Sequence, residues 1–181
     1  MDGHFTNFFN NPPHLMATEL KFDLPVDEKA IDIWDATKWK LWANKEMKHQ
    51  RPPPLNQFIQ DLLSDNWPGF DDPCYENLSI FALFLAISAF HPIVFSVRSS
   101  LCHMPDVVRQ IERALVRWMT LWERLQARLN QDQIYRAGIL IHAQDLCIFA
   151  KLLLRTPLSE TGEISRDSMA RVYELLRNAP K

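Results

Sequence analysis

The chain has 181 residues, of which 47% are hydrophobic, 11% aromatic and 23% charged. A chain of this length and composition can bury a core without disulfides and is not mainly disordered. Three cysteines without a CxxC pair exclude a disulfide-dense scaffold and a thiolate-rich zinc finger within this chain. Four glycines are few for hairpins or phosphate-binding loops.

Charge is divided unevenly along the chain. Residues 1–76 hold 7 Lys/Arg and 13 Asp/Glu, whereas residues 77–181 hold 13 Lys/Arg and 9 Asp/Glu. Because the two halves have net charges of opposite sign, they can attract each other, or each can attract a partner. The asymmetry does not by itself indicate nucleic-acid binding.

The N-terminal part predicts a leader, an extended segment and a helix. Residues 1–18 are rich in Asn, Pro and Phe, which indicates a poorly ordered leader or the cut edge of a longer protein. Residues 19–25 predict an extended segment that ends at a proline. Asp27 is expected to cap the first helix, with a break near Thr37. The apolar face of this helix contains Ile31, Trp34, Trp39 and Trp42.

Three prolines after Arg51 end the first helix, and Leu55–Leu63 predicts a short amphipathic helix. Residues 64–73 contain turn-forming residues at nearly every position and predict a loop. The stretch from Leu78 to Val97 has no charged residue and is long enough to cross a bilayer. We interpret it as a buried core helix with a kink near residues 88–92, and a single membrane span is the alternative.

The clearest amphipathic helix begins at Pro105, a residue typical of a first helical turn. Its apolar residues recur every three or four positions and cover about 80° of the helix circumference. They are Val107, Ile111, Leu115, Trp118, Trp122, Leu125 and Leu129. The opposite side carries Arg109, Arg113, Arg117, Arg124 and Arg128. We expect Trp118 and Trp122 in the core.

Asn130 is expected to end this helix, and one further helix is predicted from about Gln133 to Leu154. A loop over residues 156–162 precedes a last helix capped by Ser165. Its apolar side contains Met169, Val172, Leu175 and Leu176. Five or six helices without a convincing strand predict an all-α fold, with residues 19–178 as one bundle-like domain.

Two groups of residues resemble chemical sites. Asp71, Asp72 and Glu76 resemble an aspartate-rich magnesium motif that binds diphosphate, because carboxylates are hard oxygen ligands. Helix-breaking residues surround them and no second magnesium motif follows, so a solvated acidic loop is favoured over a prenyl-diphosphate enzyme.

Zinc accepts the donors of His142, Asp145 and Cys147, and those of Cys102 and His103. A satisfied core histidine and a buried cysteine that acts as a small hydrophobe are favoured instead. No nucleophile-elbow motif supports Ser/His/Asp catalysis. The five arginines of the helix that begins at Pro105 indicate a solvated face or a contact with acidic residues, either of the first half or of a partner. These interpretations are favoured over nucleic-acid binding.

Five short motifs in chain order resemble the fungal-specific transcription factor domain, also called the middle homology region. The first motif contains Glu19, Leu20, Leu24, Pro25, Ile33, Trp34, Ala36 and Trp39. Phe58, Leu62 and Leu63 match the second, and Leu78–Leu83 with His91 the third. Ala114, Leu115, Trp118 and Trp122 match the fourth. The fifth contains His142, Ala143, Leu146, Ala150, Leu152 and Leu153.

The resemblance covers roughly residues 16–155 and implies an all-α, non-enzymatic regulatory domain in the nucleus. It implies no catalytic residue, cofactor or metal in this chain, since zinc belongs to a DNA-binding module absent from it. The implied partners are proteins of the transcription machinery or that DNA-binding module, with no direct nucleic-acid contact and no membrane. The chain is therefore expected to be the C-terminal part of such a factor, a truncated form or a finger-less paralogue.

Overall fold

The computed structural model describes residues 22–25, 35–38, 40–41, 52–76, 78–100 and 104–156. The expected leader, the three tryptophans of the first expected helix and the helix expected from Ser165 lie outside these residues. Residues 36–38 and 40–41 are helical. Asp35 Oδ1 accepts hydrogen bonds from the backbone N–H groups of Thr37 and Lys38, so a helical turn is capped here, eight residues after the expected cap.

The expected all-α fold is confirmed. The described residues form α3 (Leu55–Leu63), α4 (Pro73–Glu76), α5 (Ile80–Ser99), α6 (Pro105–Gln126), α7 (Gln131–Ala137), the 3-10 helix η3 (Gly138–His142) and α8 (Ala143–Arg155). None of these residues forms a strand, and Asp23 and Pro54 make one isolated antiparallel bridge. Leu55–Leu63 has the bounds that its amphipathic pattern predicts.

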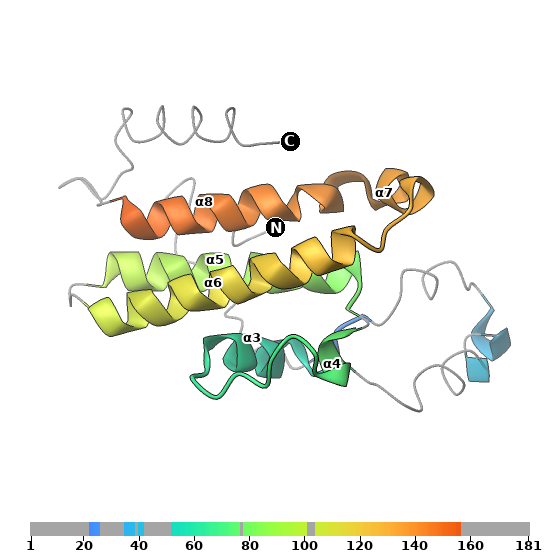
Figure 1. Ribbon diagram of the computed structural model, residues 1–181, viewed down its shortest axis with the longest axis horizontal. Helices are drawn as coiled ribbons and strands as arrows, with labels where there is room; N and C mark the ends of the chain where they lie inside the picture. The colour runs from blue at the N-terminus through green and yellow to red at the C-terminus, as the bar shows by residue number, and fades with distance from the viewer. Residues whose placement is uncertain are drawn as a thin grey trace.

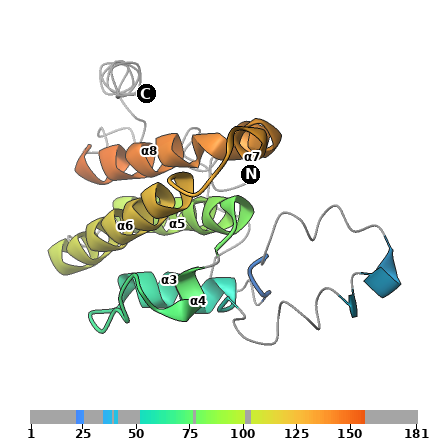
Figure 2. The same ribbon diagram turned by 45° about the vertical axis from the view of Figure 1, so that its right-hand side comes forward.

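The helices lie in three layers (Figures 1 and 2). The antiparallel pair α5 and α6 forms the middle layer, with α3 and α4 on one side and α8 on the other. Helix α5 contacts α3, α6 and α8, and α6 also contacts α3 and α8. The pair therefore forms the centre of the core.

Helix α5 supplies ten buried residues, as expected for a core helix. Ser79 caps it by accepting a hydrogen bond from the Ala82 N–H at 2.9 Å, and the helix continues through Pro92 to Ser99. His91 is fully buried and its ring stacks on that of Phe149 of α8, with 5.8 Å between the ring centres. This contact joins two layers at the middle of α5.

The apolar face of α6 packs into the core as the sequence predicts. Trp118 and Trp122 are fully buried and stack on each other, with ring centres 5.6 Å apart and planes inclined by 9°. The Trp118 indole N–H donates to the Leu83 carbonyl of α5 at 3.0 Å. The arginine side of α6 faces away from this core.

The prediction of one continuous helix from about Gln133 to Leu154 is wrong. Gly138 has φ +54°, a conformation that favours glycine, and it separates α7 from η3 and α8. Asn130 does not end α6, which stops at Gln126; instead it caps α7 in a reciprocal capping box with Gln133.

The loop predicted over residues 64–73 is confirmed except at its end. Pro73 begins the short helix α4, which was not predicted from the sequence. Proline suits a first helical turn, because its missing N–H would have no partner there, and Asp72 Oδ1 accepts from the Cys74 N–H at 2.8 Å.

Candidate functional site

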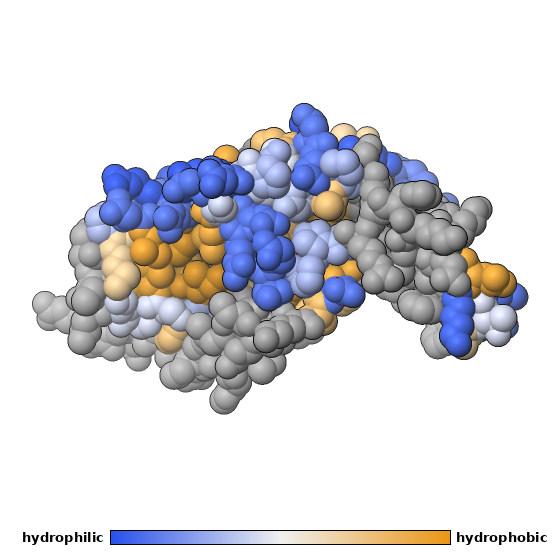
Figure 3. Space-filling model, turned by 90° about the horizontal axis from the view of Figure 1, so that it is seen from below, coloured by the Kyte–Doolittle hydropathy of each residue, from blue (hydrophilic) through white to orange (hydrophobic). Residues whose placement is uncertain are grey.

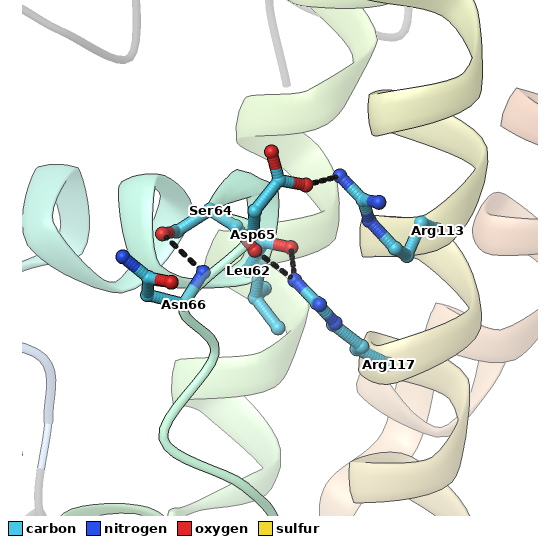
Figure 4. Close-up of polar contacts among 6 residues, drawn as sticks. All are labelled: Leu62, Ser64, Asp65, Asn66, Arg113 and Arg117. Carbon is cyan, nitrogen blue, oxygen red and sulfur yellow. Dashed lines mark hydrogen bonds and ion pairs between the residues drawn. The ribbon is translucent and has the colours of Figure 1, made fainter.

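Arginines of α6 reach across to the segment that connects α3 with α4. We call this segment, residues 64–72, the strap. Arg113 forms an ion pair with Asp65, and Arg124 Nη1 lies 2.9 Å from Asp71 Oδ1. Of the interpretations open at the sequence level, contact between the arginines and the acidic first half is therefore observed (Figure 4).

Arg117 binds the main chain where α3 ends. Its Nη1 donates to the carbonyl oxygens of Leu62 at 2.7 Å and Ser64 at 2.6 Å. Its guanidinium also lies over the Trp67 ring, 5.4 Å from the ring centre. Partial burial, with the charge of Arg113, lowers the pKa of the Arg117 guanidinium.

Arg124 repeats this arrangement two turns further along α6. Its Nη1 donates to the Phe70 carbonyl at 3.0 Å, and its guanidinium lies 5.1 Å from the centre of the Phe70 ring. Each of these two arginines thus combines carbonyl hydrogen bonds with an aromatic face, a favourable use of a planar cation. Arg109 pairs with Asp106 of its own helix.

Aromatic rings of the strap continue from these arginines into the core. The Trp67 ring stacks on Tyr75 of α4 at 4.8 Å, and Tyr75 packs against Phe58 of α3 at 5.5 Å. The Tyr75 hydroxyl donates to Asp61 Oδ2 at 2.7 Å. Burial and this hydrogen bond raise the pKa of Tyr75, so the phenol remains a donor at neutral pH.

The carboxylates of the proposed magnesium motif have other partners in the structure. Asp71 pairs with Arg124, and Asp72 caps the start of α4. The Glu76 side chain lies outside the described part. A pocket of about 20 Å³, lined by Phe70, Tyr75, Leu78, Leu121, Arg124, Leu125 and Arg128, lies beside them. Such a volume holds about one water molecule, far less than a prenyl diphosphate needs.

His142 is not the core histidine that we expected. Its side chain is 67% exposed, and Nδ1 lies 3.0 Å from Asp145 Oδ2. The break at Gly138 places His142 at the junction between η3 and α8, on the surface. Cys147 is buried, as expected for a small apolar side chain, so these three residues do not converge. Cys102 and His103 lie outside the described residues.

Cys147 is expected to resist alkylation in the folded protein. Its Sγ lies 3.5 Å from the Leu115 carbonyl, and burial raises its pKa to about 12. A raised pKa keeps the thiol protonated at pH 8, where the thiolate is the reactive form. Iodoacetamide labelling at pH 8, followed by peptide mass spectrometry, should modify exposed Cys74 first. Equal rates for the two cysteines before unfolding in urea would contradict the packing of α8.

Two helical segments in the described ranges are long and apolar enough to cross a membrane, Ile80–Ser99 and Gln131–Arg155. In the first, 56% of the most apolar window is buried within the protein, and in the second 33%. The core helix of a soluble protein passes the same test. The second segment is interrupted at Gly138, whereas α5 is one continuous helix of 20 residues, so α5 is the segment to examine in a membrane experiment.

Among the residues that the structure describes, apolar side chains are exposed at several positions, and two groups of them were not anticipated from the sequence. Helices α7 and η3 bury no residue, and Ile134, Tyr135 and Ile139 are exposed there. Figure 3 shows hydrophobic surface also at the end of the molecule where α5 finishes and α6 begins. Met104 is 42% exposed at this end. The exposure of α7 was not anticipated because residues 133–154 were predicted to form one continuous helix.

Comparisons with protein-family models, with curated proteins and with solved structures find no match to the chain. Function is therefore inferred from this chain's own residues and from the resemblance of its motifs.

Proposed function

We propose that the chain is a regulatory and interaction domain of a fungal transcription factor. This proposal is supported by the position of the residues that carry the resemblance, because they come together in the core. Members of all five motifs are buried in one hydrophobic cluster. They include Leu24, Phe58, Leu62, Leu78, Leu83, Ala114, Leu115, Trp118, Trp122, Ala143, Ala150 and Leu153. Motifs of one domain are expected to share a core in this way.

The proposal places the domain in the nucleus, where it acts through protein contacts rather than through catalysis. Its partners are proteins of the transcription machinery or a zinc-dependent DNA-binding module outside this chain. The arginines of α6 support a role without direct nucleic-acid contact, because Arg113, Arg117 and Arg124 already bind the strap. No catalytic residue, metal or cofactor is assigned to this chain.

A reporter experiment in a fungal cell tests this function. The chain is fused to a heterologous DNA-binding module upstream of a reporter gene, and transcription is compared with that module alone. A severalfold change is expected with the wild-type chain and with Val116→Asp, since Val116 is 56% exposed. Leu115→Asp places a charge in the core at the neighbouring buried position and should abolish the change.

Three results would overturn the proposal. The first is an unchanged reporter with a fusion whose helicity shows that it is folded. The second is recovery of the chain in carbonate-resistant membrane pellets, which would indicate that α5 spans a bilayer. The third is magnesium-dependent turnover of farnesyl diphosphate that is lost when Asp71 and Asp72 are replaced by asparagine.

A further inference from the structure

We propose that the strap is an internal ligand of the arginine face of α6, and that an acidic segment with aromatic residues from a partner protein can replace it. The arginine face here means Arg113, Arg117 and Arg124. The contact would be autoinhibitory, because the surface that recognises the partner is occupied by the chain itself. This inference depends on the contacts of α6 and not on the transcriptional role, so each can fail separately.

The strap contacts α6 in the manner of a bound peptide. It supplies two carboxylates, from Asp65 and Asp71, to two arginines of one helix face. Between them it supplies two aromatic rings, Trp67 and Phe70, each beneath a guanidinium. Carboxylate, ring and carbonyl are the three groups that the arginine fork binds well. A segment from another protein with the same groups in the same order would satisfy the same arginines.

Trp67 and Phe70 are only partly buried and pack against the edge of the core cluster, so release of the strap costs these contacts. Three other features favour release. The side chains of Asp65 and Asp71 are 73% and 94% exposed, so their ion pairs are weak and are screened by salt. The Trp67 indole N–H is buried and has no hydrogen-bond partner in the described ranges, which disfavours the closed position. The strap has no helix of its own before Pro73. Segments of this kind open locally at lower free energy than core helices.

A tethered ligand sets a threshold for any competitor. Because α3 and α4 hold both ends of the strap, it meets the arginines at an effective concentration on the order of millimolar. A partner segment must compete with the bound strap. Its apparent affinity is therefore its intrinsic affinity multiplied by the fraction of molecules in which the strap is released. Weakening the strap should therefore strengthen binding of the partner.

Hydrogen exchange tests whether the strap opens by itself. The double variant Asp65→Asn, Asp71→Asn removes both charges and keeps the side-chain shapes. Exchange of its strap amides at low salt should be about three- to ten-fold faster than in the wild type, since exposed ion pairs are individually weak. Amides of α5 and α6 should be unchanged. The matched control is Asp106→Asn, which removes the Arg109 ion pair on the same helix and should not affect the strap.

Peptide binding tests whether the strap is a competing ligand. The probe is a fluorescein-labelled peptide with the sequence of residues 64–73, titrated into each full-length variant and followed by anisotropy. The double variant should bind it about three- to ten-fold more tightly than the wild type, in line with the expected opening. Replacing Arg124 with Gln in the double variant should weaken binding. The proposal would be overturned by equal affinities for the wild type and the double variant. It would also be overturned if the strap amides exchanged only when the whole core unfolds.

Discussion

Replacing Trp118 with alanine is expected to lower the free energy of unfolding by about 3–5 kcal/mol. The side chain is fully buried, stacks on Trp122 and donates its indole N–H to the Leu83 carbonyl of α5. Truncation removes the transfer energy of the ring, leaves a cavity between the two central helices and ends that hydrogen bond. Urea unfolding followed by circular dichroism measures the loss.

Two variants separate this packing from general damage to α6. Val116→Ala, two residues away and 56% exposed, should change stability by less than about 0.5 kcal/mol. Trp118→Phe keeps an aromatic ring but not the N–H. Its loss of stability should therefore lie between that of Val116→Ala and that of Trp118→Ala. A loss below about 1 kcal/mol for Trp118→Ala would contradict the stacked position of this residue in the core.

Helices whose pattern is set by local periodicity could be predicted from the sequence. The apolar positions of α6 share one side of the helix, and Trp118, Trp122 and Leu115 are all fully buried. The bounds of α3 follow from prolines before it and turn residues after it. In both helices the local helical preference of the residues agrees with their tertiary contacts. The sequence pattern alone is therefore sufficient to predict these helices.

The chain between α6 and α8 shows where periodicity fails. An apolar run from Gln133 to Leu154 reads as one helix, yet Gly138 interrupts it with a positive φ. The signals were present: Asn130 and Gln133 have the spacing of a capping box, and Gly138 is a residue typical of a helix end. Missing them also led to the wrong interpretation of His142, because its exposure depends on the direction of the chain after the break.

The strap contacts could not be predicted from one sequence. Asp65 and Arg113 are 48 positions apart, and their pairing depends on how α3 lies against α6. Only the uneven charge of the two halves indicated that such contacts were possible. The order of acidic and aromatic residues in the strap acquires meaning once the arginines are seen opposite them.

Replacing Leu24 with alanine is expected to cost about 2–5 kcal/mol of stability, although the residue lies in a short extended segment. Leu24 is 1% exposed, and main-chain contacts hold the segment on both sides of it. The Phe22 carbonyl accepts from the Leu55 N–H at 3.1 Å, and the Pro25 carbonyl accepts from the Ser79 hydroxyl at 3.0 Å. The segment thus joins the starts of α3 and α5, and Leu24 is the side chain that anchors it.

Phe22→Ala is the matched control, because Phe22 belongs to the same segment and is 39% exposed. Its cost should be well below that of Leu24→Ala when both are measured by urea unfolding. Exchange of the Leu55 amide gives a second reading, since release of the segment removes the partner of that N–H. If Leu24→Ala speeds this exchange but hardly lowers global stability, the segment is an attached strand and not part of the core. A loss of at least 2 kcal/mol would show that α3 and α5 depend on it for their packing.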